Sequence, residues 1–248
     1  MLNLRVIASS SKGNAYLLKG SQTKLLIECG VSYKEIQTAL GFKLNIDGCI
    51  ISHEHKDHSK AAKDLLEKGC TDVYTTKGTK EALRLNHYRL KEIAPKKQLS
   101  IGQFNILPFD IEHDAKEPVG FIIYDTVTDE KILFITDSYY CKYKFTGITS
   151  MIIECNYTDE KLKENVEAGE VDKELKDRVI RSHFSLENVK DLINANDGNI
   201  IGSVILIHMS DRNSEPHRMK REIQDINHVE NVYVASKGME IDICDLPF

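Results

Sequence analysis

The chain has 248 residues, of which 41% are hydrophobic and 29% are charged, and its mean hydropathy is -0.34. These values are ordinary for a globular protein, and a chain of this length can bury about 70% of its unfolded surface without disulfides as staples. The net charge of -5 argues against a broad basic coat for nucleic acid but leaves room for a local cationic groove. We expect one domain over residues 1–248.

The location of the protein is indicated by what the sequence lacks. No apolar run approaches the roughly 20 residues that a membrane span requires, and Arg5 interrupts the only short apolar stretch at the start. The cysteines include no C-x-x-C pair, which suggests neither a disulfide framework nor a thiolate zinc site. We therefore expect a cytoplasmic protein without membrane contact. Its reduced, mostly buried cysteines are Cys29, Cys49, Cys70, Cys141, Cys155 and Cys244.

The first forty residues alternate strand and turn signals. An antiparallel meander is predicted, with strands at 4–8, 15–18 and 24–29 and a polar turn at 9–14. Ser32 followed by Glu35 has the spacing of a capping box ahead of Ile36, which predicts a short helix there.

The stretch 48–58 places three imidazoles and a carboxylate within six positions, directly after an apolar run that predicts a buried strand. Neutral imidazole and carboxylate are ligands that suit zinc, manganese or iron. His53 and His55 share a face of extended chain and can hold one ion together. Asp57 and His58 lie nearer a helix predicted at 59–68, where they are better placed for a second ion. A histidine-rich surface turn is the alternative, which the preceding strand disfavours.

Further potential ligands follow the predicted strands of the middle region. A strand is predicted at 72–76, a helix at 79–86 with Thr79 as its N-cap, and a loop at 91–98. Four more strands are predicted, at 104–109, 120–125, 131–135 and 151–154. His113 and Asp137 come shortly after two of these strands.

The last third is mainly helical. Residues 158–181 are strongly charged with helical spacing, split by Gly169, and predict a solvated face. A helix capped by Ser185 is predicted at 186–194, and a buried strand at 204–207 ends at His208. A helix at 215–226 and strands at 231–235 and 239–243 complete the chain. This order predicts sheets flanked by helices.

Potential metal ligands thus occur at four strand ends, in the order H-x-H-x-D-H, His, Asp and a late His. This series resembles the metallo-β-lactamase superfamily over most of the chain. In finer detail the chain is similar to the WalJ/YycJ-type exonucleases of that fold. The segments that carry this likeness are 8–15, 134–137, 154–156, 182–188 and 207–213.

The resemblance implies an α/β (α+β) fold, a four-layer αββα sandwich with two divalent ions, zinc or manganese, between its sheets. One ion would be held by His53, His55 and His113, the other by Asp57, His58 and His208, with Asp137 bridging them. Such ions can share a hydroxide and clamp a phosphoryl or acyl oxygen. Asp57 would also orient that nucleophile.

Three features depart from the family pattern. Glu28 stands where the family usually has an aspartate, and its extra methylene can disturb support of the ligands. Tyr157 stands where WalJ-like chains tend to carry a histidine, so a substrate contact and a packing role are both open. The 71 positions from Asp137 to His208 are too few for the nucleic-acid clamp of the ribonuclease J group, which disfavours that branch.

The resemblance also bears on the substrate. The Ser-His-Phe-Ser context of His183 resembles a Gly-His-x-Ser segment of WalJ-like proteins, and the helix after it would present free N–H groups to a phosphate. We expect His183 to act on the substrate, with a structural role as the alternative. Hydroxyl and amide groups are better suited to phosphate than to an apolar acyl group. The predicted substrate contacts are Ser11, Asn14, Ser185 and Ser210.

These observations favour a metal-dependent phosphodiesterase acting on nucleic acid, DNA more than RNA, as a 5′ exonuclease or a related nuclease. A hydrolase of a small ester, thioester or lactam on the same scaffold is the alternative. A binding module without catalysis is disfavoured by the completeness of the ligand set.

Overall fold

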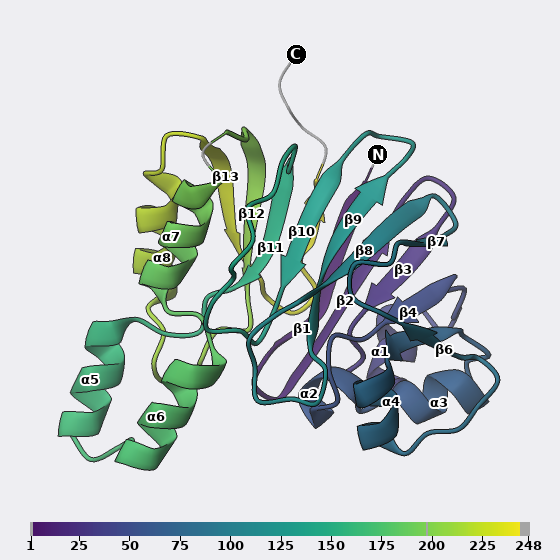
Figure 1. The fold of residues 1–248 in the computed structure, drawn as a ribbon, viewed down its shortest axis with the longest axis horizontal. Coiled ribbons are helices and arrows are strands. Elements are labelled where there is room, and N and C mark those ends of the chain that lie inside the picture. The colour runs from purple at the N-terminus through teal and green to yellow at the C-terminus, as the bar shows by residue number, and fades with distance from the viewer. Residues whose placement is uncertain (1, 197, 244–248) are drawn as a thin grey trace.

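Two seven-stranded sheets pack face to face in the computed structural model, which describes residues 2–196 and 198–243 (Figure 1). The first sheet contains β1 (Asn3–Ser10), β2 (Gly13–Lys19), β3 (Lys24–Ile27), β4 (Gly48–Ile50), β5 (Val73–Thr76), β6 (Leu90–Ile93) and β14 (Glu240–Asp242). The second contains β7 (Leu99–Ile101), β8 (Phe104–Asp110), β9 (Val119–Asp125), β10 (Lys131–Ile135), β11 (Ser150–Glu154), β12 (Ile201–Ile207) and β13 (Val229–Val234). The first is ordered β14-β1-β2-β3-β4-β5-β6 and the second β13-β12-β11-β10-β9-β8-β7.

Helices lie outside the two sheets. They are α1 (Tyr33–Ala39), α2 (Lys56–Ser59), α3 (Ala62–Glu67), α4 (Lys77–Leu83), α5 (Asp159–Glu167), α6 (Lys173–Ser182), α7 (Leu186–Ala195) and α8 (Pro216–Gln224). Ile36 of α1 and Leu65 of α3 pack on the first sheet, while Val189 of α7 and Met219 of α8 pack on the second. The predicted αββα sandwich is confirmed. No helix of the described residues is long and apolar enough to cross a membrane.

The main hydrophobic core lies between the two sheets. Leu18 and Ile50 of the first sheet belong to the same buried cluster as Phe104 and Phe134 of the second, and none of these four side chains is exposed to solvent. Burying apolar surface contributes about 25 cal/mol per Å², so this layer fixes the two sheets relative to each other. Groups at the sheet ends therefore have a rigid support.

Strand direction brings several strand ends to one edge of the second sheet. β8 and β10 are both antiparallel to β9, and β10, β11 and β12 are parallel to one another. The four strands β8, β10, β11 and β12 therefore end at the same edge. In the first sheet β3, β4 and β5 are parallel as well.

Most predicted elements are present, with corrections at their ends. The capping box of Ser32 and Glu35 is confirmed, as is the Ser185 cap of α7. The helix predicted at 79–86 begins earlier, at Lys77, because Thr76 and not Thr79 supplies the cap. The loop predicted at 91–98 is wrong in its first part, which belongs to β6. The helix predicted at 59–68 is in fact two short helices, α2 and α3.

The helices α5 and α6 form a hairpin that projects from the sandwich, and we call residues 159–182 the arm (Figure 1). The predicted split at Gly169 is confirmed, since its φ of +74° suits glycine and lies between the two helices. Tyr157 packs with Leu162 and Val171 in a small buried cluster at the arm's base, which favours the packing role for Tyr157.

The cysteines of the described chain are free thiols. Cys29, Cys49 and Cys155 are buried, Cys141 is partly buried and Cys70 is exposed, so the expectation of mostly core residues holds for the majority. Cys244 lies outside the described residues.

Candidate metal centre

The chain leaves the first sheet at the end of β4 and continues into residues 51–58, which we call the histidine loop. Ser52 and His53 are completely buried, and the Ser52 hydroxyl lies 2.8 Å from Nδ1 of His53, which fixes the orientation of that imidazole. The helix α2 begins at Lys56, so Asp57 and His58 sit on its single turn. The loop therefore presents His53 and His55 from a short extended segment, and Asp57 and His58 from a helical turn. His53 and His55 point to the same site, as the alternation of side chains in an extended chain predicted.

The loop packs directly against the residues that follow β3. The backbone N–H of Cys29 donates to the carbonyl of His58 at 2.8 Å, and the N–H of Ala61 donates to the carbonyl of Cys29 at 2.8 Å. A Cβ atom added at Gly30 would lie 1.6 Å from the carbonyl oxygen of Asp57. Only glycine fits at this position, and its absence of a side chain lets the metal-type side chains approach the sheet.

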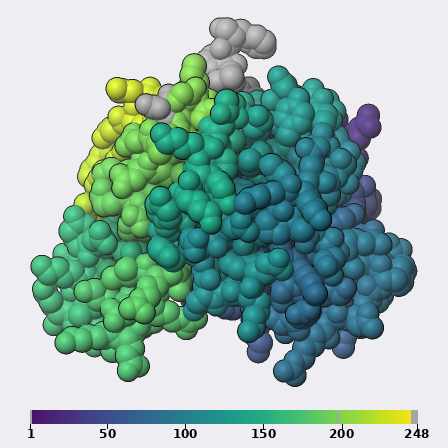
Figure 2. Space-filling model, viewed as in Figure 1, coloured from purple at the N-terminus to yellow at the C-terminus, as the bar shows by residue number. Residues whose placement is uncertain are grey.

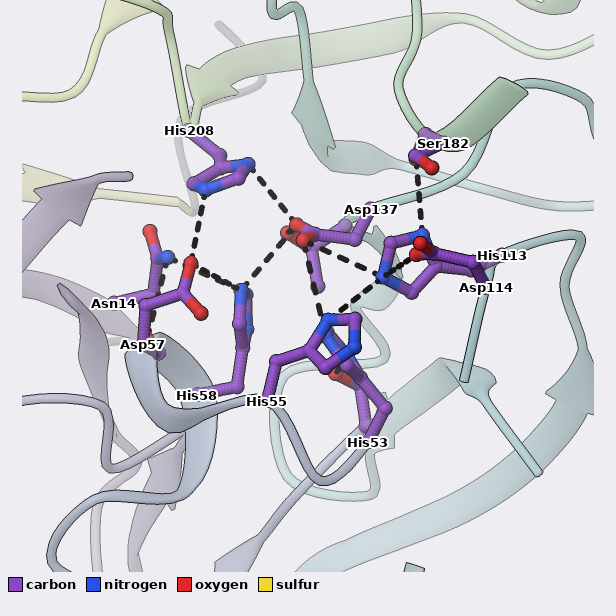
Figure 3. Close-up of polar contacts among 12 residues, drawn as sticks. Asn14, His53, His55, Asp57, His58, His113, Asp114, Asp137, Ser182 and His208 are labelled. Atoms are coloured by element: carbon purple, nitrogen blue, oxygen red, sulfur yellow. Dashed lines mark hydrogen bonds and ion pairs between the residues drawn. The ribbon is translucent and has the colours of Figure 1, made fainter. Parts of the chain in front are cut away.

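The second sheet contributes three further side chains from its strand ends. His113 follows β8, Asp137 follows β10 and His208 follows β12 (Figure 3). Asp137 and His208 have φ values of +43° and +50°, a conformation that non-glycine residues rarely adopt. Such strain persists where the surrounding structure fixes it, and it clusters at functional sites.

These side chains form two groups that share Asp137. On one side, Oδ2 of Asp137 lies 3.8 Å from Nε2 of His53 and 3.8 Å from Nε2 of His113, whose ring is 3.1 Å from Nδ1 of His55. On the other side, Oδ1 lies 3.3 Å from Nε2 of His58 and 3.0 Å from Nδ1 of His208. Asp137 thus offers one oxygen to each group.

The second group is completed by Asp57. Its Oδ2 lies 3.5 Å from Nε2 of His58 and 3.5 Å from Nε2 of His208. All seven residues predicted as metal ligands are therefore brought together, in the two sets that the resemblance implied.

The donor atoms fit divalent metal ions. Among the described residues, the buried Nε2 atoms of His53 and His208 have no hydrogen-bond partner, a costly state for polar atoms unless another ligand binds them. Ligands about 2.0–2.1 Å from a tetrahedral zinc ion lie roughly 3.3–3.5 Å from one another. The observed separations of 3.3–3.8 Å between donor atoms are close to this spacing. These imidazole and carboxylate groups could hold divalent metal ions.

Glu154 is a site residue that the sequence prediction did not include. Its Oε1 lies 2.7 Å from Nδ1 of His208 and 2.7 Å from Nδ1 of His183, and its side chain is completely buried. Its Oε2 accepts from the backbone N–H groups of Ser138 and Phe184 at 3.2 Å. Its sequence signals are an acidic residue at the end of an otherwise apolar strand and its place in segment 154–156, which carries part of the family likeness.

Glu28 supports the histidine loop on the other side. Its Oε1 accepts from the N–H of Ser52 at 3.1 Å, and its Oε2 lies 3.5 Å from Nδ1 of His58. The longer side chain that replaces the usual aspartate therefore supports the loop through Ser52, whereas its Oε2 and Nδ1 of His58 are not hydrogen-bonded to each other.

Burial sets the direction of the pKa shift of His53, whereas neighbouring opposite charges set the direction for Asp137, His58 and His208. Burial lowers the pKa of His53, and the neighbouring His58 lowers it further. Burial opposes ionisation of Asp137, but the charges of His208 and His58 outweigh it and hold the pKa of Asp137 well below its usual range. Burial likewise opposes protonation of His58 and His208, but Asp137 raises the pKa of both. The carboxylates are therefore ionised at neutral pH, as metal ligands must be.

A cavity of about 500 Å³ opens over the two groups, between the arm and the body of the protein. The space-filling view shows a hollow between the green arm and the teal part of the molecule (Figure 2). Ser11, His183 and Ser210 line this cavity, as expected for substrate contacts. Arm residues line it as well, which corrects the prediction that 158–181 is only a solvated face.

Two of the predicted substrate contacts lie outside the cavity lining. Asn14 is completely buried, and its amide donates to the carbonyl of Ser10 at 3.1 Å and lies 3.2 Å from Nε2 of His58. Ser185 is 3% exposed, and its hydroxyl accepts from the N–H of Asn188 at 3.2 Å as the α7 cap. The structure thus accounts for Asn14 as support of the histidine loop and for Ser185 as a helix cap.

The order and geometry of these ligands can be compared with known proteins. Residues 23–209 match the model of the beta-lactamase superfamily domain, which covers most of the chain and all seven ligands. The chain belongs to the metallo-β-lactamase superfamily. This confirms the resemblance seen in the sequence, and with the donor set it makes the protein a metal-dependent hydrolase.

Two curated relatives in this superfamily are exonucleases. Exodeoxyribonuclease WalJ of Streptococcus pneumoniae serotype 2 is 28% identical, over 96% of this chain and 90% of that protein. Exodeoxyribonuclease YycJ of Bacillus anthracis is 26% identical, over 65% of this chain and 66% of that protein. The finer likeness to WalJ/YycJ-type proteins is therefore confirmed at the level of sequence.

Solved structures show the same metallo-β-lactamase fold at low identity. The metallo-beta-lactamase fold protein YhfI from Bacillus subtilis has a TM-score of 0.74 at 17% identity, over 98% of this chain and all of that one. The short form of human tRNase Z has a TM-score of 0.65 at 14% identity, over 98% of this chain and 100% of that one. These likenesses show the fold.

Proposed function

We propose that this protein is a metal-dependent phosphodiesterase that removes nucleotides from the end of a DNA strand, as a 5′ exonuclease. The observation that carries the proposal is the placement of Asp137, which offers one oxygen to each histidine group at the base of the cavity. Two metal positions sharing a carboxylate suit displacement at phosphorus. The exodeoxyribonuclease names of WalJ and YycJ point to DNA as the substrate.

Seven side chains would hold two divalent ions, zinc or manganese. His53, His55 and His113 hold one ion, Asp57, His58 and His208 hold the other, and Asp137 lies between them. When bound, such ions make water a nucleophile near neutral pH and neutralise charge on the phosphate.

Asp57 would orient the attacking water. Its side chain is 26% exposed, whereas that of Asp137 is almost completely buried, so Asp57 is the more accessible of the two carboxylates of the second group that line the cavity. Burial opposes its ionisation, but the imidazoles of His208 and His58, each 3.5 Å away, keep the pKa of Asp57 below its usual value. It is therefore ionised and can accept a hydrogen bond from water.

His183 would act on the substrate from outside the ligand set. Its Nδ1 is held by Glu154 at 2.7 Å, which leaves Nε2 for the cavity that the ring lines. Burial opposes protonation, but the charge of Glu154 raises the pKa of His183 above its usual value. The imidazolium can donate a hydrogen bond to the phosphate or a proton to the leaving oxygen. The hydroxyls of Ser11 and Ser210 line the same cavity and can donate to phosphate oxygens.

The proposal is tested by metal analysis and a substrate panel. Reconstituted protein should bind about two divalent ions per chain. It should cleave 5′-phosphorylated or 5′-hydroxyl DNA, cleave RNA less well, and leave a chromogenic lactam and a thioester almost untouched. Robust lactam or thioester hydrolysis without action on nucleic acid would establish the alternative, a small-molecule hydrolase, instead.

Variants make the test specific to the metal centre. His53→Ala and Asp137→Ala should abolish activity while circular dichroism shows a retained fold. His217→Ala is the matched control, because His217 is exposed on α8 and outside both ligand groups. Full activity in both ligand variants, or metal-free protein after reconstitution, would contradict the dinuclear assignment.

A further inference from the structure

Three aliphatic side chains of the arm line the cavity: Val171, Leu175 and Val179, which we call the wall. Leu175 and Val179 lie one helical turn apart on α6, so they share a face. Leu175 is 45% exposed although α6 is otherwise rich in charged residues. Single exposed leucines are common on protein surfaces, but this one lines the same cavity as the candidate metal ligands, together with Val171 and Val179.

The arm holds this wall in place through its base. The N–H of Thr158 donates to the carbonyl of Asn213 at 3.0 Å, and the amide of Asn165 donates to the carbonyl of Arg212 at 3.0 Å. Arg218 of α8 binds Glu160 at 2.9 Å. The wall therefore stands at a fixed place beside the cavity, over a floor formed by imidazoles and carboxylates.

A ligand that fits both surfaces has a charged group for the floor and an apolar face for the wall. A nucleotide has both, since its phosphate is an anion and its base presents a flat face that packs on apolar side chains. Valine and leucine side chains have no hydrogen-bonding atoms, so this wall cannot distinguish one base edge from another. Arg178 also lines the cavity, where its side chain is 66% exposed and its Nε lies 3.6 Å from Oδ2 of Asp114.

We propose that Leu175 and Val179 bind the terminal nucleobase of the strand, without regard to base identity, while its phosphate lies at the metal centre. This inference rests on the proposed nuclease function and adds a specificity-determining surface to it. Arg178 is placed to bind the phosphate of the next nucleotide.

The test combines one change in the protein with one change in the substrate, and compares the effect of each change with and without the other. Leu175→Ala and the wild type are assayed on oligodeoxynucleotides that end in a normal nucleotide or in an abasic residue, with the abasic residue placed at either terminus. If the base packs on Leu175, the variant should raise KM about fivefold on the normal end, with kcat changed less than about twofold. On the abasic end the variant should match the wild type within about twofold, because the contact is already missing.

Two variants that each introduce one negative charge on α6 provide a matched control. Leu175→Glu should raise KM at least about tenfold. Ile180→Glu, which makes the same charge change on the same helix, should stay within about twofold, because Ile180 is exposed and does not line the cavity. The effect of Leu175→Ala should be equal for oligonucleotides ending in each of the four bases.

The possible outcomes are distinct. Effects of Leu175→Ala that are equal on normal and abasic ends would overturn the base contact while leaving the nuclease function intact. Equal losses in Leu175→Glu and Ile180→Glu would overturn it as well, because they would indicate a general effect of charge. A wild-type protein that cleaves neither kind of oligonucleotide would overturn the nuclease function, and this inference with it.

Discussion

Glu154 links the metal ligands to the residue proposed to act on the substrate. One carboxylate oxygen lies 2.7 Å from Nδ1 of both His183 and His208, so both rings are held with Nε2 pointing away from it. For His208 that atom lies near Asp57, in the second ligand group, and for His183 it remains for the cavity. A carboxylate behind a ligating imidazole fixes its tautomer and raises its basicity. Glu154 therefore acts as a positioning residue for two functions at once.

Replacing His183 tests this division of roles. His183→Ala should keep its metal content but lose about tenfold to a hundredfold in rate, the effect of removing a hydrogen bond of about 1.5–3 kcal/mol to a charged group. His208→Ala should lose an ion. Metal stoichiometry and nuclease rate are measured side by side for both variants. An ion lost from His183→Ala and retained in His208→Ala would show that His183 is the late metal ligand.

The candidate ligands at 53–58 were predictable from sequence because their pattern is local, whereas His113, Asp137 and His208 were assigned to the site through the family resemblance. His53, His55 and Asp57 differ in position by two, directly after an apolar strand, and few structures other than a metal site use such a pattern. Asn14 was harder, because an amide in a polar turn can face either substrate or the protein interior. Glu154 gave no comparable signal, since only the fold brings it within reach of His183.

Among the elements, the helical turn α2 shows what sequence patterns miss. The predicted helix at 59–68 was placed after His58, whereas the chain turns helical at Lys56 and is interrupted before α3. This early start is set by tertiary contacts, including the hydrogen bond from the N–H of Cys29 to the carbonyl of His58. The wrong cap at Thr79 has a different cause, because Thr76, three positions earlier at the end of β5, offers an equivalent hydroxyl.

The close approach of this turn to Gly30 gives a prediction about stability. Gly30→Ala should destabilise the protein by at least about 2 kcal/mol, because its Cβ cannot coexist with the carbonyl of Asp57 and the histidine loop must move. Metal affinity should fall with it. Gly198→Ala is the control, since a Cβ there meets nothing within 4 Å, and it should stay within about 0.5 kcal/mol. Urea unfolding and metal titration of the two variants provide the comparison, and equal stability would contradict the contact.

The cap of α7 provides a second prediction at this scale. Ser185→Ala should cost about 1 kcal/mol through loss of the bond from the N–H of Asn188, and Ser185→Thr should keep most of that stability. Thermal unfolding measures both. The nuclease rate should change little where the variants are folded. A rate loss of more than about tenfold in folded Ser185→Ala would restore the substrate contact predicted from sequence.

In the whole molecule, the metal centre lies where the two sheets meet. The first sheet supplies His53, His55, Asp57 and His58, while the second supplies His113, Asp137 and His208. Bound ions would therefore connect the two sheets as well as activate water. The sandwich was predictable from the order of strands and helices, but the projection of the arm beside the cavity was not. Its charged sequence shows helices and does not show what lies opposite them.

Metal removal should lower the melting temperature, and the effect should depend on pH. In the metal-free protein Asp137 raises the pKa of His208, so this pairing stabilises the fold below the usual imidazole pKa and fades as pH rises through the raised value. Metal binding strengthens as pH rises, because protons no longer compete for the imidazoles. The shift in melting temperature on adding ions should therefore grow between about pH 5.5 and pH 8.

The same measurement on Asp137→Ala separates the two contributions. Without the shared carboxylate, added ions should leave the melting temperature nearly unchanged across this range. A shift that shrinks with rising pH in the wild type would contradict ligation by imidazole.

The pairing of β1 with β14 has a consequence for how the protein is made. Asn3 lies opposite Asp242, so strands from the two ends of the described chain complete one sheet. Contacts so distant in sequence form slowly, and a growing chain on the ribosome exposes the edge of β1 until β14 has emerged. The second ion's ligand His208 also emerges late. We therefore expect the second group to bind an ion only after residue 208 has emerged, and the half-made chain to depend on chaperones that shield an open sheet edge.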